Sequence, residues 1–227
     1  IIDSLSKLKS AKFAKDNQLF NPRISSSDQL KTVRYTLDNV HDFAFFAEKG
    51  YIVQSGVVKL PHSGREVKLY AMYYPTNHKV WNNSIDYLRD AVYYYSLWNG
   101  DYPYDVCTAV DGAIAAGGGM EYPTITVIGN ADDTTDLDLV IAHEVGHNWF
   151  YGILGSNERA SGWMDEGVNS FNEMRYMQLK YPHYNMTEMI LPGKYAKKMF
   201  INHKESYRLA AQLTQQLSIH QKLSTHS

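Results

Sequence analysis

The sequence predicts an α+β fold, because strand patterns dominate its first part and helical patterns follow them. Residues 51–60 and 66–74 are rich in Val, Leu and Tyr and flank the turn sequence PHSG, which is typical of a two-stranded hairpin. Residues 79–99 have the apolar spacing of a helix, and Gly100 is expected to end it. Residues 32–40 alternate as a further strand would.

Bulk properties limit the class of protein. The 227 residues suffice for one large domain, or for one domain plus a remnant, and a hydrophobic content of 44% is ordinary for a globular chain. The net charge of −2 and the lack of a basic block argue against nucleic acid or an anionic membrane as partner. No apolar run approaches the roughly 18 residues of a membrane span. Cys107 is the single cysteine, which excludes an internal disulfide.

The sequence HEVGH at 143–147 predicts a metal site. His143 and His147 are four residues apart, so on a helix their imidazoles share one face and can reach one tetrahedral metal ion. Glu144 flanks that face and is placed to reach a water on the metal rather than the metal itself. After eighteen intervening residues, Glu166 offers a third ligand from a second helix that is expected to begin near Trp163. Two His, one Glu and one open position are typical of a catalytic zinc site.

The surroundings of this motif favour a metal site over a chance match. The pattern alone occurs by accident in roughly one chain in fifty of this length. Ile141, Val145 and Trp149, however, share the opposite helix face, so the helix is expected to bury its back in a core. Gly146 lowers helix propensity by about 1 kcal/mol, which indicates a packing reason such as the close approach of a neighbouring strand. The acidic residues in ADDTTD, at 131–136, are expected to cap the helix.

A glycine-rich stretch, GGGMEYP at 117–123, precedes this helix. A phosphate cradle is rejected, because neither Gly-Lys-Ser/Thr nor a helix follows at once. Two interpretations remain: a flexible turn before the strand TITVIG, or a backbone edge at Gly118, Gly119 and Met120 against which an extended peptide lies. In the second case Glu121 would face the cleft, where its carboxylate can bind the free α-amine of a peptide.

In combination, the ligand spacing, the sequence WMDEG around Glu166 and the stretch GGGMEYP resemble the zinc aminopeptidases typified by alanyl aminopeptidase (aminopeptidase N) and leukotriene hydrolase. That family carries a Gly-x-Met-Glu-Asn motif upstream of its zinc helix, and Tyr122 replaces the final Asn here. The resemblance implies a thermolysin-like gluzincin catalytic domain with an N-terminal mixed-sheet lobe and a helical zinc-site region. It also implies one zinc ion per chain, Glu144 as general base, and peptides with a free N-terminus as substrates.

The resemblance covers roughly residues 35–227 and suggests how the chain is organised. Residues 1–48 are expected to be the remnant of an N-terminal β domain and its linker. Residues 49–227 are expected to form the catalytic domain without its C-terminal helical part, and partner domains of a parent chain are expected. In the family a tyrosine about 60–65 residues after the glutamate ligand holds the oxyanion. No tyrosine follows Tyr207 in this sequence. We therefore expect the oxyanion-binding tyrosine to lie outside this sequence, and the fragment to be weakly active.

Two other functions were weighed. A thermolysin-like endopeptidase carries Asn-Glu-x-x-Ser-Asp around its third ligand, and MDEGVNS does not match that pattern. A non-catalytic binding module on a peptidase fold usually loses the metal residues, all of which are present here. Asp165 and Asn148 are both candidates for orienting a metal-bound imidazole, and surface or capping roles are equally open for them.

Overall fold

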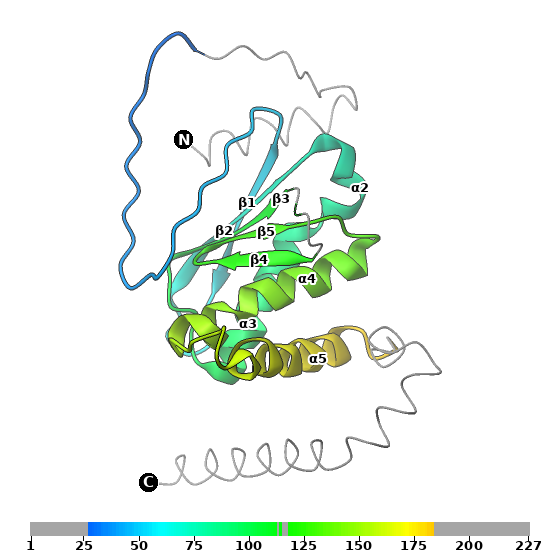
Figure 1. The fold of residues 1–227 in the computed structure, drawn as a ribbon. Coiled ribbons are helices and arrows are strands. Elements are labelled where there is room, and N and C mark those ends of the chain that lie inside the picture. The colour runs from blue at the N-terminus through cyan, green and yellow to red at the C-terminus, as the bar shows by residue number, and fades with distance from the viewer. Residues whose placement is uncertain (1–26, 113, 115–117, 184–227) are drawn as a thin grey trace, which may run out of the picture. The chain divides into compact units, whose positions relative to one another are not determined.

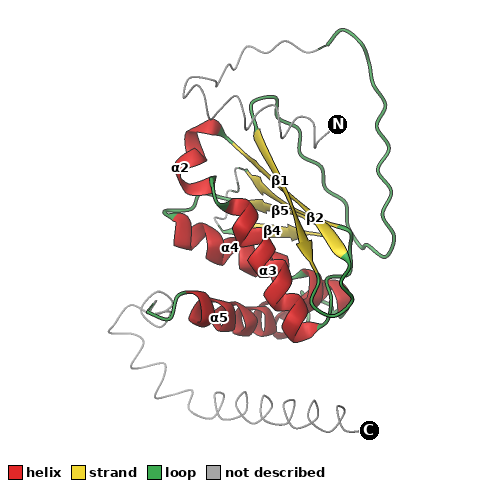
Figure 2. Cartoon of the chain, turned by 180° about the vertical axis from the view of Figure 1, so that it is seen from behind, coloured by secondary structure: helices red, strands yellow, loops and turns green. Residues whose placement is uncertain are grey.

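The computed structural model describes residues 27–112, 114 and 118–183. The strands are β1 (Ile52–Lys59), β2 (Glu66–Tyr73), β3 (Val106–Asp111), β4 (Gly119–Tyr122) and β5 (Ile125–Ile128); the helices are α2 (His78–Trp81), α3 (Ser84–Asn99), α4 (Thr134–Gly146) and α5 (Val168–Lys180). The strands form one mixed sheet in the order β1-β2-β3-β5-β4. Helices α3 and α4 pack on one face of this sheet, and α5 packs against both helices (Figures 1 and 2). The predicted α+β fold is confirmed.

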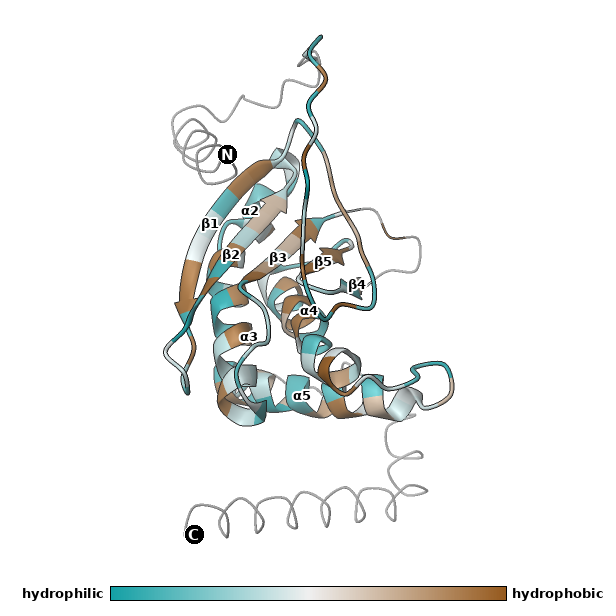
Figure 3. Cartoon of the chain, turned by 90° about the vertical axis from the view of Figure 1, so that its left-hand side faces the viewer, coloured by the Kyte–Doolittle hydropathy of each residue, from teal (hydrophilic) through white to brown (hydrophobic). Residues whose placement is uncertain are grey.

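The strand directions place β4 at one end of the sheet. β2, β3 and β5 run parallel to one another, whereas β1 and β4 are antiparallel to their neighbours. β3 and β5 are almost entirely buried and hydrophobic, as expected for central strands covered on both faces (Figure 3). On the face away from α3 and α4, Phe46 packs on a cluster of Tyr51, Val53 and Val110. The hairpin predicted for residues 51–60 and 66–74 is confirmed as β1 and β2.

Two predictions in the first half of the chain were wrong. The helix predicted over 79–99 ends before Gly100 as predicted, but it is interrupted at Asn82 and Asn83, where the Asn82 carbonyl accepts a hydrogen bond from the Gln54 side chain at 3.1 Å. The break lets Trp81 bury itself, with its ring centroid 5.8 Å from that of Tyr73. Residues 32–40 form no strand, and the side chains of Val33, Tyr35 and Leu37 are exposed. Alternation predicts a strand only where a partner strand is present to pair with it.

The helix that carries HEVGH forms as predicted. The Asp133 side chain caps α4 by accepting hydrogen bonds from the backbone N–H groups of Thr135 (2.7 Å) and Asp136 (2.9 Å). Ile141, Val145 and Trp149, which were predicted to share the inner face of this helix, are buried. Gly146 does mark a close approach, but of two helices rather than a strand. A Cβ there would overlap Asn169 of α5 and the Tyr95 ring of α3.

A kinked segment reverses the chain after α4. The π-helical turn η2 (Asn148–Ile153) contains Tyr151 at a φ of 94°, and Gly155 follows at 60°. A second π-helical turn, η3 (Trp163–Gly167), carries Glu166 and leads directly into α5. The helix predicted to begin near Trp163 is thereby confirmed, and it ends at Lys180.

Chain contacts divide the protein into two units, residues 1–180 and 181–227. Of the second unit the structure describes only residues 181–183, so Tyr207 lies outside the described residues, as does most of the predicted remnant at 1–48. Those domain boundaries remain predictions. None of the described helices is both long and apolar enough to cross a bilayer.

Candidate metal centre

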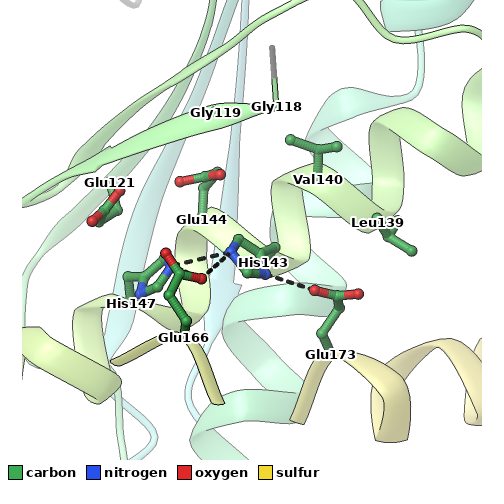
Figure 4. Close-up of a pocket in the computed structure, with 10 residues that line it drawn as sticks. All are labelled: Gly118, Gly119, Glu121, Leu139, Val140, His143, Glu144, His147, Glu166 and Glu173. Atoms are coloured by element: carbon green, nitrogen blue, oxygen red, sulfur yellow. Dashed lines mark hydrogen bonds and ion pairs between the residues drawn. The ribbon is translucent and has the colours of Figure 1, made fainter. Parts of the chain in front are cut away.

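Three side chains from two helical segments converge at the end of α4. The Nε2 atoms of His143 and His147 lie 3.1 Å apart. Oε2 of Glu166, from η3, lies 3.2 Å from the first Nε2 atom and 3.8 Å from the second. Figure 4 shows both imidazoles and the carboxylate directed toward one another. The predicted convergence on one point is therefore present in the fold.

These distances fit one divalent cation. Zinc bonds imidazole nitrogen and carboxylate oxygen at roughly 2.0–2.2 Å, so the edge of its coordination tetrahedron is about 3.4 Å. The three measured separations fall on both sides of that value. All three ligand atoms also belong to one of the candidate metal-binding groups among the described residues.

Acidic side chains lie behind both imidazoles. Oε2 of Glu173 lies 2.6 Å from Nδ1 of His143. Oδ1 of the buried Asp165 lies 2.6 Å from Nδ1 of His147, and the Phe150 carbonyl oxygen lies 3.3 Å from the same atom. The hydrogen bonds of the two Nδ1 atoms, with Glu173 and with the Phe150 carbonyl, keep the proton on Nδ1 and leave Nε2 free for a metal ion. Of the two candidates named from the sequence, Asp165 therefore lies behind an imidazole and Asn148 does not.

The two imidazoles differ in protonation when no metal is bound. Burial lowers the pKa of His143, but the hydrogen bond with Glu173 and the charges of Glu144 and Glu166 outweigh it and raise that pKa to about 9. Burial lowers the pKa of His147. A proton on His143 thus supplies the positive charge that a metal ion would bring to the same carboxylates.

Glu144 is buried beside the ligands rather than among them. Its Oε2 has no hydrogen-bond partner among the described residues. Burial, together with neighbouring carboxylates, raises the pKa of Glu144 to about 8 against the opposing charge of His143. Its carboxylate lies against the backbone of Gly119, where a Cβ would overlap it. Only glycine at this position lets β4 approach the helix so closely.

The end strand β4 forms the other wall of the same pocket. Gly118, Gly119 and Glu121 line a cavity of about 290 Å³ together with the metal residues, Glu144 and Glu173. The nearest carboxylate and imidazole atoms of Glu121, Glu144 and His147 lie within 4.8 Å of one another. Burial raises the pKa of Glu121. Met120 lies between two residues that face the pocket, does not line it and is 37% exposed, so its predicted part in substrate binding stays a prediction.

The chain was compared with known proteins. The sequence profile of the peptidase family M1 domain matches residues 89–226, which is more than half of the chain. This chain belongs to peptidase family M1. No curated protein sequence matches it. Similar solved structures include the M1 zinc metallopeptidase of Deinococcus radiodurans (20% identity, 60% of this chain and 31% of that chain, TM-score 0.45). Another is Legionella pneumophila aminopeptidase A in complex with aspartic acid (14% identity, 56% and 16%, TM-score 0.47).

The chain thus spans about a third or less of the length of these proteins. Within this M1 domain, sequence reasoning missed one acidic residue behind the metal site. Glu173 lies seven residues after Glu166, which is two helical turns along the same face, and that spacing was the available signal. The wall of the pocket contributed by β4 was, in contrast, indicated by the glycines at 118 and 119.

Three kinds of chemical group lie together at this site of the M1 domain. Two imidazoles and a carboxylate offer metal ligands, an unpartnered buried carboxyl offers a proton acceptor, and Glu121 offers a second negative group on the opposite wall. This is the set needed for metal-assisted hydrolysis of a substrate anchored by a positive charge.

Proposed function

We propose that this M1 domain is the catalytic part of a zinc aminopeptidase that removes N-terminal residues from peptides. The observation that carries the proposal is the common pocket, in which the three ligand atoms, the Glu144 carboxyl and the Glu121 carboxyl lie on two facing walls. One zinc ion per chain would be held by Nε2 of His143, Nε2 of His147 and Oε2 of Glu166. Zinc in such a site lowers the pKa of a bound water to about 7 and polarises a carbonyl group.

Glu144 serves as general base in this proposal. The Glu144 carboxyl lines the pocket, and its Oε2 has no hydrogen-bond partner among the described residues, so the carboxyl can accept a proton from the attacking water and return it to the leaving amine. A buried carboxyl is suited to both steps, because a pKa near the working pH makes proton uptake and release comparably favourable. The overlap that a Cβ at Gly119 would create reflects the close approach of β4 to this carboxylate, which supports the proposal.

Glu121 and β4 supply the substrate-binding half of the proposal. An extended peptide can add to the end strand β4 through main-chain hydrogen bonds. The Glu121 carboxylate would then bind the free α-ammonium group by a charge-assisted hydrogen bond. Because this carboxylate lies beside His147, only the first peptide bond would reach the metal site.

A pair of substrates tests this function. The zinc-loaded chain is expected to release 4-nitroaniline from alanine 4-nitroanilide and to leave the N-acetylated anilide largely uncleaved. Glu144→Gln should lower the rate by about 10²–10⁴ while zinc content stays at one ion per chain. Glu121→Gln should raise KM for the free-amine substrate. Preference for the acetylated substrate would indicate an endopeptidase instead. Activity that survives Glu144→Gln would overturn the proposal.

A further inference from the structure

Asn148 directly follows the metal-binding His147, yet its side chain points toward the sheet. It is 8% exposed. Its Nδ2 donates a hydrogen bond to the Val145 carbonyl at 2.9 Å, and its Oδ1 accepts one from the Thr124 backbone N–H at 3.3 Å. The hydroxyl of the buried Tyr102 lies 3.5 Å from the same oxygen. The Asn148 side-chain amide therefore joins the end of α4, the helix that carries HEVGH (the metal helix), to the turn between β4 and β5.

The backbone of the turn between β4 and β5 is strained, so contacts from neighbouring elements must stabilise it. Tyr122 pairs with Ile125, so Pro123 and Thr124 form a two-residue connection. Thr124 has a φ of 67°. Proline followed by a residue of positive φ is the pattern of a type II turn, whose second position is normally Gly or Asn. A β-branched residue is strained there, and it persists only where its surroundings fix it. The Thr124 carbonyl accepts from Thr108 N of β3 at 2.8 Å, and its N–H is the group that Asn148 binds.

The β4–β5 hairpin and the metal helix run alongside each other with matching contacts. Gly119 lies against the Glu144 carboxylate, and Glu121 lies beside His147. Thr124 lies on Asn148 one residue further along the helical segment. The contact between Thr124 and Asn148 is a directional hydrogen bond. The contact of Gly119 with Glu144 is steric, and the contact of Glu121 with His147 joins two residues of the pocket itself. The bond at Thr124 therefore gives the hairpin a directional link to the helical segment that carries His147.

We propose that Asn148 is a positioning residue that holds the β4–β5 hairpin against the metal helix and so fixes the distance between the Glu121 carboxylate and the metal centre. The inference rests on the proposed function for its catalytic consequence. Its structural part, the dependence of the hairpin on Asn148, stands on the hydrogen bonds alone.

The test compares Asn148→Ala with Asn172→Ala in the zinc-loaded chain. Asn172 is an apt control because it is also buried, donates to a helix carbonyl (Val168 O, 3.0 Å) and accepts one side-chain hydrogen bond, but contacts neither β4 nor β5 in the described hydrogen bonds. Amide hydrogen exchange is measured over residues 119–128 and over α3. In Asn148→Ala, exchange in the hairpin should rise about tenfold, the size expected for one lost buried hydrogen bond, with α3 unchanged and zinc retained. Asn172→Ala should leave the hairpin protected.

Unchanged hairpin exchange in Asn148→Ala would overturn the proposal. So would a uniform rise over the hairpin and α3, because it would show a general loss of stability rather than a hold on the hairpin. The activity readout is the ratio of rates on free-amine and N-acetylated alanine anilide, which should fall about tenfold in Asn148→Ala. If the wild-type chain cleaves neither substrate, the proposed function fails, and the exchange data still decide the role of Asn148.

A second variant tests the route through Thr124. Thr124→Gly removes the strain of the positive φ, so the hairpin should then depend less on Asn148. The effect of Asn148→Ala on hairpin exchange should be smaller in the Thr124→Gly background than in the wild type. Equal effects in both backgrounds would show that Asn148 does not act through this turn, and would overturn the proposal.

Discussion

At the scale of single residues, Glu173 contacts His143, one of the three proposed zinc ligands. Its Oε2 lies 2.6 Å from Nδ1 of His143 and so holds the ring with Nε2 toward the other ligands. Glu173→Gln replaces that negative oxygen by a neutral amide, and we expect zinc affinity to fall about 10–100-fold. Competition with a chromophoric chelator measures this change. Gln178→Ala, on the exposed side of α5, is the control and should bind zinc as the wild type does.

Gly119 is a second residue whose identity matters for the site. A methyl group there would overlap the Glu144 carboxylate, which must then leave its place or push β4 away. We expect Gly119→Ala to lower the rate on alanine anilide by about 10², since a displacement of roughly 1 Å at a reacting group has that effect. Metal content should not change. Gly162→Ala is the matched control, because a Cβ at Gly162 would meet no atom within 4 Å. Equal losses in the two variants would refute the steric argument.

At the scale of elements, one ionic cluster links α3, α4 and α5. Nζ of Lys180, in α5, lies 2.7 Å from Asp138 of α4 and 2.7 Å from Asp90 of α3. The hydroxyl of Tyr176 donates to the other oxygen of Asp138 at 2.7 Å, and Asp138 is fully buried. This cluster fixes the relative positions of the helix that carries the imidazoles and the helix that follows Glu166.

Removal of the Lys180 ammonium should therefore destabilise the fold. Lys180→Met leaves Asp138 buried without its cation, and we expect the free energy of unfolding to fall by about 3 kcal/mol. Burial lowers the pKa of Lys180, but Asp138 and Asp90 outweigh it and raise that pKa. The contribution is thus fully present below the unfolded-state pKa of about 10.4 and is lost only as pH rises through the higher folded-state value.

Urea denaturation at pH 7 and pH 9 measures this difference, which should be the same at both pH values. The double variant Asp138→Asn with Lys180→Met should regain part of the loss, because it buries no unpaired charge. A larger loss in the double variant than in Lys180→Met would contradict this account of the cluster.

At the scale of the whole molecule, sequence patterns predicted those features that depend on local spacing. The shared face of His143 and His147 and the buried side of α4 follow from helical periodicity, and the alternation of β1 and β2 follows from strand geometry. Features that depend on a distant partner were missed. The Gln54 side chain bonds the Asn82 carbonyl at the break before α3, and the Asn148 side chain bonds the Thr124 N–H. Residues 32–40 alternate like a strand but have no strand beside them in the described part of the chain.

Zinc binding should connect these scales, because the ligands come from α4 and from η3 and meet only in the folded chain. A ligand that binds only the folded state stabilises it by about 4 kcal/mol at a concentration a thousand times its Kd. For a chain of this size that corresponds to a rise in Tm of roughly 8–16 °C. Differential scanning calorimetry of the zinc-loaded and chelator-treated protein measures the shift.

The sign of the pH dependence follows from the ligands. Imidazoles bind zinc only when neutral. In the metal-free site burial lowers the pKa of His143, but Glu173, Glu144 and Glu166 outweigh burial and raise that pKa to about 9. Zinc must therefore displace a proton, and the rise in Tm on adding zinc should shrink as pH falls from 8 to 6. Glu166→Gln removes one ligand from the second helical segment and should abolish most of the shift at both pH values. A shift of full size in Glu166→Gln would mean that zinc stabilises the protein at another site, and the convergence of α4 and η3 on one ion would then be refuted.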